Sequence, residues 1–182
     1  MKFVTSVDIT PSVKKISYSD KILLLGSCFA DNIGAKFGEH YFQTTVNPYG
    51  TLYNPASIAK ALSGVVNQEM GIGIVQHNGL WHSFSHHGSF SRTDKEDLVR
   101  ACEQSRVQLC VALQQATTVM VTFGTAWVYE YEGEVVANCH KLPANQFVRR
   151  RLTVNEIVAM WQPIIDAMPD KHWIFTVSPI RH

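Results

Sequence analysis

The sequence has few charged residues, and its positive and negative charges nearly balance. Charged residues make up 17% of its 182 residues, and 16 Lys and Arg against 15 Asp and Glu leave a net charge of +1. A nucleic-acid partner usually needs a concentrated basic face. The only basic cluster is Arg149–Arg151, which we interpret as a solvated face or an ion-pair site. We therefore expect no nucleic-acid partner.

Long apolar runs and paired cysteine motifs are also missing. The apolar runs fall far short of the roughly 20 residues of a membrane-spanning helix, and residues 1–15 have no apolar core of a secretory signal. The four cysteines contain no C-x-x-C spacing. We expect reduced thiols, no membrane association and a cytoplasmic protein.

No internal repeat or low-complexity linker divides the chain, and 46% of its residues are hydrophobic. A chain of this size buries roughly 70% of its unfolded surface. We therefore expect one domain spanning residues 1–182.

Three short apolar runs predict strands that are buried on both faces, as in a parallel sheet. They occupy residues 21–25, 119–123 and 173–177. Helical patterns separate them, at residues 30–37, 55–66, 94–115 and 153–167. Alternating strands and helices indicate an α/β domain with a mainly parallel sheet.

Two hairpins interrupt this alternation. One covers Ile72–Phe84 around Asn78-Gly79, and the other covers Trp127–Val136 around Glu132-Gly133. We expect both as insertions at the rim of the sheet. The strand at 173–177 has no following helix to cover it, so we expect either a truncated C-terminus or a partner, such as a second copy, on that strand.

A candidate nucleophile follows the first predicted strand. Ser27 comes directly after Gly26, where a helix begins and its amides can stabilise an oxyanion. The simpler interpretation is an N-cap serine. Cys28 is the rival nucleophile, with His140 as its partner, but we favour a buried structural thiol at this position.

Histidines gather around the first hairpin, at His77, His82, His86 and His87. No cysteine or carboxylate is spaced to complete a tetrahedral zinc site with them, so we expect polar groups and no metal. His140 is interpreted either as a pocket residue or as a hydrogen-bonded structural histidine.

Several motifs together resemble one family. They are Gly26-Ser27-Cys28-Phe29-Ala30, the stretch Asn47–Pro55, the stretch Phe123–Glu130, and Asn138-Cys139-His140-Lys141 with Pro143. This set resembles the GSCFA family, whose members are similar to the SGNH (GDSL-like) hydrolases. The resemblance covers nearly the whole chain and implies a three-layer α/β/α, flavodoxin-like fold.

The resemblance also implies site residues. Ser27 matches the nucleophile, and Gly50 matches the glycine that offers an N–H to the oxyanion. Gly124-Thr125 stands where SGNH hydrolases have Gly-x-Asn, so Thr125 or Asn138 would replace the asparagine donor. Cys28, Asn47, Gly124 and His140 are expected to line the pocket. The Asp-x-x-His element is absent, which places the general base downstream of His182 or on His182 itself.

The function implied by this resemblance is a serine esterase or acyltransferase that acts on a small or carbohydrate-linked ester. The reaction would pass through an acyl-serine and need no cofactor. Two alternatives remain: a non-catalytic ligand-binding module on the same fold, and a thiol enzyme using Cys28 and His140.

Overall fold

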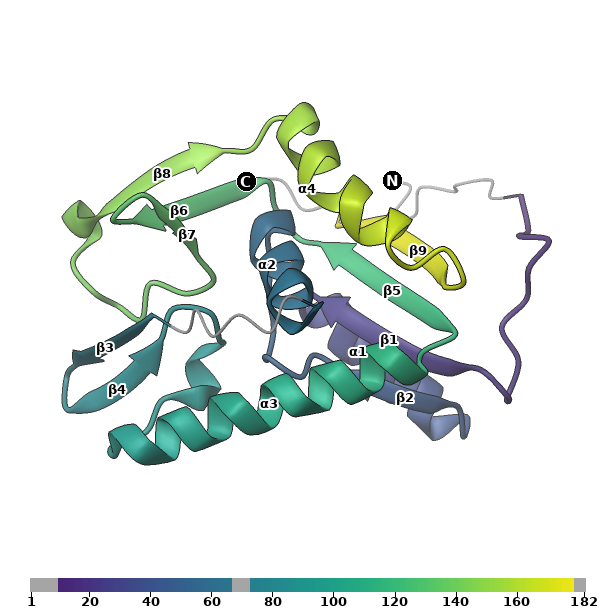
Figure 1. The fold of residues 1–182 in the computed structure, drawn as a ribbon, viewed down its shortest axis with the longest axis horizontal. Helices are drawn as coiled ribbons and strands as arrows, with labels where there is room; N and C mark the ends of the chain where they lie inside the picture. Colours follow the sequence, from purple (N-terminus) through teal and green to yellow (C-terminus); the bar gives the residue numbers. More distant parts are fainter. Residues whose placement is uncertain (1–9, 67–72, 179–182) are drawn as a thin grey trace, which may run out of the picture.

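The computed structural model describes residues 10–66 and 73–178 (Figure 1). Its centre is a four-stranded sheet in the spatial order β2-β1-β5-β9. In chain order, this part contains β1 (Lys21–Gly26), α1 (Cys28–Glu39), β2 (Gln43–Val46), α2 (Pro55–Val66), α3 (Lys95–Gln115), β5 (Thr118–Phe123), α4 (Val154–Asp166) and β9 (His172–Val177). All neighbouring strands in this sheet are parallel. The predicted α/β class with a parallel sheet is confirmed.

Alternating residues of β1 supply two cores, one on each face of the sheet. Ile22 and Leu24 face α1 and pack with Ala30. Leu23 and Leu25 face the other way, into a larger core. That core also contains Ile58 and Leu62 of α2, Leu109 and Leu113 of α3, and Trp161 and Ile164 of α4. Burial on both faces explains why β1 is a continuous apolar run.

The ends of the helices carry the caps that the sequence indicates. The Asn54 side chain accepts a hydrogen bond from Ser57 N at 2.8 Å before α2. Asp94 caps α3, and Thr153 forms a capping box with Glu156 at the start of α4. These side chains satisfy amide groups that have no partner within the first turn of a helix.

Both predicted hairpins are present beside the main sheet. The first pairs β3 (Ile74–His77) with β4 (Leu80–Ser83), and its predicted start at Ile72 lies outside the described residues. The second pairs β6 (Trp127–Tyr131) with β7 (Glu134–Val136). An unexpected strand, β8 (Phe147–Arg151), joins β6 on its other side. Figure 1 shows the arrowheads of β1 and β5 pointing toward the side where these strands lie.

The basic cluster lies on β8 and forms contacts within the protein. Arg150 contacts Glu130 at 2.6 Å and Glu156 at 2.7 Å. The Arg149 guanidinium lies 4.1 Å from the centre of the Trp127 ring. Two ion pairs and a cation–π contact thus give Arg149 and Arg150 structural partners, and the ion-pair interpretation of this cluster is confirmed.

The last strand is only partly covered. β9 lies at the edge of the sheet order, and its Phe175 and Val177 side chains are 39% and 77% exposed.

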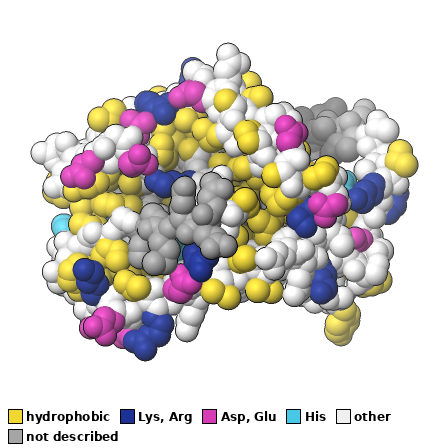
Figure 2. Space-filling model, in the orientation of Figure 1, with side chains coloured by type: hydrophobic (Ala, Val, Ile, Leu, Met, Phe, Trp, Pro, Cys, Tyr) yellow, Lys and Arg dark blue, Asp and Glu magenta, His cyan; other side chains and the backbone are white. Residues whose placement is uncertain are grey.

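Figure 2 shows charged side chains of both signs interspersed on the viewed face. No helix within residues 10–66 and 73–178 has the length and apolar character to cross a bilayer.

Candidate functional site

The order of the strands identifies the point in the sheet where open α/β proteins commonly bind ligands. From β1 the chain passes to β2 on one side, and it later returns to β5 on the other side of β1. Where the direction of winding reverses, the connections leave a crevice at the carboxyl ends of the two strands. Here those strands are β1 and β5. Ser27 follows β1 directly, and Gly124 follows β5 directly.

Backbone crowding requires a glycine before the serine. Gly26 has φ +133°, and a Cβ on it would lie 2.2 Å from the carbonyl oxygen of Thr122. L-residues with a side chain rarely adopt that φ, and the space is already occupied. Without a Cβ at residue 26, β1 can approach β5 closely enough for Gly26 to pair with Thr122. The register then carries Ser27 to the tip of the sheet.

Ser27 forms the N-cap of α1. Its backbone is extended, at φ −71° and ψ 178°, and its Oγ accepts a hydrogen bond from Phe29 N at 3.3 Å. The side chain therefore lies at the positive end of the helix dipole, where negative charge on oxygen is stabilised. The residue is only 4% exposed. The structure thus confirms the N-cap interpretation. The capping role does not exclude a second, chemical role for Ser27.

Asn47 ties the serine segment to the next loop. Its Oδ1 accepts from Gly26 N at 2.8 Å, and its Nδ2 donates to Asp31 Oδ1 at 2.6 Å. Its own amide donates to Leu24 O at 2.9 Å, and its φ is +42°. One side chain thus links the end of β1 to the first turn of α1, on either side of Ser27.

Gly50 follows Asn47 in a tight turn. Gly50 has φ +73°, and its N–H donates to Asn47 O at 2.7 Å. A Cβ at residue 50 would lie 2.4 Å from the Cβ of His87. The expected oxyanion donor is therefore held close to the serine segment through Asn47, and its N–H is used within the turn.

Gly124 lies directly against the serine. A Cβ on Gly124 would lie 3.3 Å from Ser27 Cβ and 3.1 Å from Tyr53 Cδ1. The amides of Gly124 and Thr125 both donate to Tyr53 O, at 2.8 and 3.0 Å. Burial, followed by the nearby Cys28 and Asp31, raises the pKa of Tyr53. Ser27, Tyr53 and Gly124 thus form the walls of one small region.

Asn138 and His140 belong to a neighbouring group. Asn138 Oδ1 accepts from His140 N at 2.8 Å, and His140 has φ +49°. His140 Nε2 donates to Ser83 O at 2.7 Å, and its ring stacks on His82 at 4.6 Å. Burial lowers the pKa of His140. A neutral imidazole that is fixed by a carbonyl matches the structural interpretation of this histidine.

Gly88 connects this group to the serine region. A Cβ on Gly88 would lie 3.6 Å from Asn138 Nδ2. Gly88 follows His87, which contacts Gly50 and whose N–H donates to Tyr49 O at 3.0 Å. The amide of Asn138 therefore lies next to the segment that packs on Gly50.

The side chains considered as a base or a rival nucleophile are not bonded to Ser27. No histidine in residues 10–66 and 73–178 forms a hydrogen bond with Ser27 Oγ. Cys28 is exposed at the first position of α1, where its side chain does not pack into the sheet, so the expectation of a buried thiol is wrong. No contact joins it to His140 among the described residues. His182 lies outside those residues. In the same part of the chain, no three His, Cys, Asp or Glu side chains gather to hold a metal ion.

Two contributors were not expected from the sequence. Asp31 binds Asn47, and its position four residues after Ser27 puts it in the first turn of α1, where acidic residues are favoured. His87 packs on Gly50, and its Nδ1 accepts from Ser89 N at 3.2 Å. The helix-start position could have indicated Asp31. No local pattern indicates that His87 packs on Gly50.

Comparison with known proteins supports one assignment. Residues 21–182 match the GSCFA family, and this range includes every site residue described above. No curated protein and no solved structure matches the chain. Because the match covers most of the sequence, the chain belongs to the GSCFA family.

Proposed function

We propose that this protein is a serine esterase or acyltransferase of the SGNH type, with Ser27 as its nucleophile. One observation carries the proposal: Ser27 stands at the reversal point of a parallel sheet, at the start of a helix and against Gly124. Renumbered within the sheet, the strand order is 2-1-3-4, which is how the flavodoxin-like order begins. That order supports the finer fold assignment.

The reaction would proceed through an acyl-serine. Ser27 Oγ attacks the ester carbonyl carbon, and its proton passes to a histidine base. The tetrahedral intermediate then breaks its bond to the alcohol oxygen, which leaves with a proton. Water, or the hydroxyl of an acceptor in a transferase, attacks the acyl-serine and releases the acid or a new ester. Since no described histidine contacts Ser27, His182 is the candidate base within this chain.

Oxyanion donors must come from amides near Ser27. The N–H of Ser27 itself has the weakest present bond, to Thr122 O at 3.4 Å, so it is the donor most easily recruited. Gly50 and Thr125 N–H groups are bonded more closely, at 2.7 and 3.0 Å. The Asn138 amide has no hydrogen bond to another described residue through Nδ2. We assign the hole to Ser27 N–H, with the Asn138 amide as the second donor; Gly50 and Thr125 would have to break closer bonds to contribute.

A non-catalytic binding module is the second candidate. It is favoured because Ser27 is nearly buried, caps α1 and has no described histidine partner. In that case the region around Ser27 and Gly124 would bind a ligand without turning it over.

Fluorophosphonate labelling distinguishes the two. The probe forms a covalent bond with an activated serine, and intact mass with peptide mapping locates it. We expect label on Ser27 that is lost in Ser27→Asn, a variant that retains a capping side chain. Ser19→Ala, at an exposed serine, is the control and should label normally. A His182→Asn variant that loses the label assigns the base.

Each opposing outcome is distinct. Absence of label in the folded protein, both in this chain and in the longest product of its gene, supports the binding module and refutes the esterase proposal. Loss of label in Cys28→Ala, together with label mapped to Cys28, would instead support the thiol enzyme. Label on a serine other than Ser27 would mean that the site has been misplaced.

A further inference from the structure

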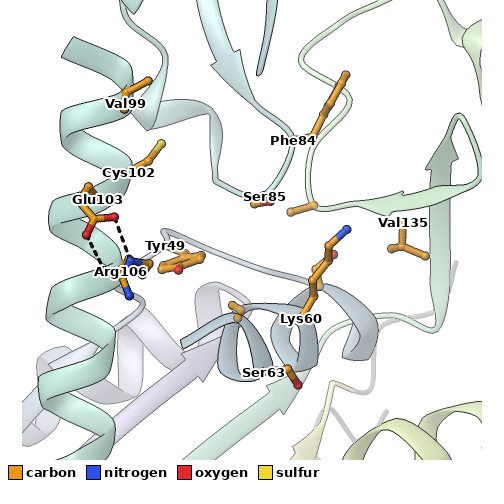
Figure 3. Close-up of a pocket in the computed structure, with 14 residues that line it drawn as sticks. Tyr49, Lys60, Ser63, Phe84, Ser85, Val99, Cys102, Glu103, Arg106 and Val135 are labelled. Carbon is orange, nitrogen blue, oxygen red and sulfur yellow. Dashed lines mark hydrogen bonds and ion pairs between the residues drawn. The ribbon is translucent and has the colours of Figure 1, made fainter. Parts of the chain in front are cut away.

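A separate cavity lies between α2, α3 and the segments that follow β4 and β7. Its volume is about 120 Å³, and Figure 3 shows the side chains that surround it. Much of its wall is apolar, from Ala61 on α2, Phe84 after β4, Val99 on α3 and Val135 on β7. Ser27 does not line it. We call it the Tyr49 cavity, after the ring that lies between α2 and α3 in Figure 3.

Two hydroxyl groups at this cavity have no hydrogen-bond partner among the described residues, and that of Ser57 is buried. Tyr49 is 8% exposed and Ser57 is 6% exposed, and both line the cavity. Ser57 Oγ is buried without a partner, and no described group bonds the Tyr49 hydroxyl. Buried polar groups are nearly always hydrogen-bonded in folded proteins, so the buried Ser57 hydroxyl indicates a bound partner in this cavity.

The tyrosine is held in place and keeps its proton. Its ring stacks on the buried His86 ring at 4.3 Å between centres. Burial raises the pKa of Tyr49 to about 12, which the neighbouring Arg106 charge partly opposes. The hydroxyl therefore remains a hydrogen-bond donor at neutral pH.

Two cationic side chains at the cavity can donate hydrogen bonds to a ligand. Lys60 and Arg106 line it, against the single carboxylate of Glu103. Glu103 binds Arg106 through two hydrogen bonds of 2.9 and 2.6 Å, and Lys60 contacts Glu134 at 3.0 Å. In Figure 3, Arg106 lies beside Tyr49 on the α3 side, and Lys60 extends from α2 on the opposite side. Each of the two cations thus has one carboxylate partner, and Arg106 is the cation that lies beside the Tyr49 ring.

The volume limits the size of the molecule. A protein cavity of about 150 Å³ can hold benzene. The Tyr49 cavity is somewhat smaller but partly open, so a polar group can extend from it, and it combines apolar walls with hydroxyl groups and cationic side chains. We propose that it is a binding site for a small monocarboxylate with an apolar body of about six carbon atoms. The carboxylate would accept from Tyr49 and Arg106, and the body would contact Ala61, Phe84 and Val99.

Benzoate is a suitable probe, and benzyl alcohol is its uncharged counterpart. We would titrate each into the whole protein and follow backbone amide resonances by NMR. We expect benzoate to bind saturably and to shift the resonances of Tyr49, Ala61 and Val99. Benzyl alcohol should bind at least tenfold more weakly, because it has no charge for Arg106.

Variants locate the site. Tyr49→Phe and Arg106→Gln should each weaken benzoate binding about tenfold or more. Tyr41→Phe, at an 89% exposed tyrosine, and Arg100→Gln, which breaks a similar i,i+3 pair with Asp97 on the same helix, are matched controls and should bind normally. Ala61→Leu should fill the cavity and abolish binding while the amide spectrum remains dispersed.

Three results would overturn the proposal. They are an absence of saturable binding to the wild-type protein, unchanged affinity in both Tyr49→Phe and Arg106→Gln, and equal affinity for benzoate and benzyl alcohol. The third would describe an apolar cavity without preference for a carboxylate. Ser27→Asn should leave benzoate binding unchanged, so failure at Ser27 and failure at this cavity are observed separately.

Discussion

Acid should destabilise this protein through His86, at a pH well above the range where carboxylates titrate. His86 is 1% exposed. Its Nε2 contacts Ser105 Oγ at 3.0 Å, and that hydroxyl already donates to Cys102 O, so Nε2 carries the proton. Nδ1 then accepts from Ser83 Oγ at 2.8 Å. The neutral ring is fully bonded, and burial lowers its pKa to about 4.

The sign and size of the effect follow from proton linkage. An unfolded histidine has a pKa of about 6.5, so as the pH falls below this value the unfolded state binds a proton before the folded state does. The stabilisation is complete above pH 6.5, declines toward pH 4 and stays constant below. Between pH 7.5 and 5.0, His86 alone should lower the free energy of unfolding by about 2 kcal/mol. The lowered pKa of His140 adds in the same direction.

Urea unfolding at pH 7.5 and pH 5.0 measures the difference. At pH 5.0 the carboxylates with lowered pKa values are still ionised in the unfolded state, so they contribute little. His86→Phe keeps an aromatic ring beside Tyr49 and should lose about 2 kcal/mol of the pH dependence. His40→Gln, at an exposed histidine, should not. Equal pH dependence in wild type and His86→Phe, or an NMR titration of His86 near pH 6.5, would refute the reasoning.

Other predictions test the serine segment. Gly26→Ala should lower the free energy of unfolding by about 3 kcal/mol or more, because its Cβ meets Thr122 O. The control Gly133→Ala, with positive φ but open space, should lower it by about 1 kcal/mol. Equal losses for the two variants in urea unfolding would contradict this account. Asn47→Ala should cost about 1–3 kcal/mol, and the double exchange Asn47→Asp with Asp31→Asn should recover more stability than either single change, by thermal unfolding. Ser27→Ala should destabilise by about 1 kcal/mol and Ser27→Asn by less; equal unfolding midpoints for Ser27→Ala and wild type would argue against the N-cap.

The strands that sequence reasoning found differ physically from those that it missed. β1 and β5 are continuous apolar runs because they are buried on both faces. β2 has the sequence Gln-Thr-Thr-Val and lies at the edge of the sheet, where no residue is fully buried. β8 contains three consecutive arginines, and its extended conformation depends on pairing with β6. Both missed strands are specified by their partners more than by their own residues.

The residues of the candidate site also differ in how far the sequence alone predicts their roles. Ser27 could be predicted because a glycine, a strand end and a helix start lie next to one another in the sequence. The role of Asn47 depends on a bond to Gly26, 21 residues away, and on its positive φ. Gly50 contacts His87, which lies far from it in the sequence, and no local pattern predicts that contact. Sequence reasoning thus reached the residue that would react and missed the contacts that position it.

The backbone around Ser27 separates the shape of the site from its chemistry. Gly26, Asn47 and Gly50 all adopt positive φ, so few other residues could take their places. Ser27 itself has an extended backbone that any residue can adopt. An evolving or engineered protein could therefore exchange the reacting group at position 27, for example Ser27→Cys, without rebuilding the frame. One substitution can thus change the reacting group of this site, whereas moving the site to another position would require many substitutions.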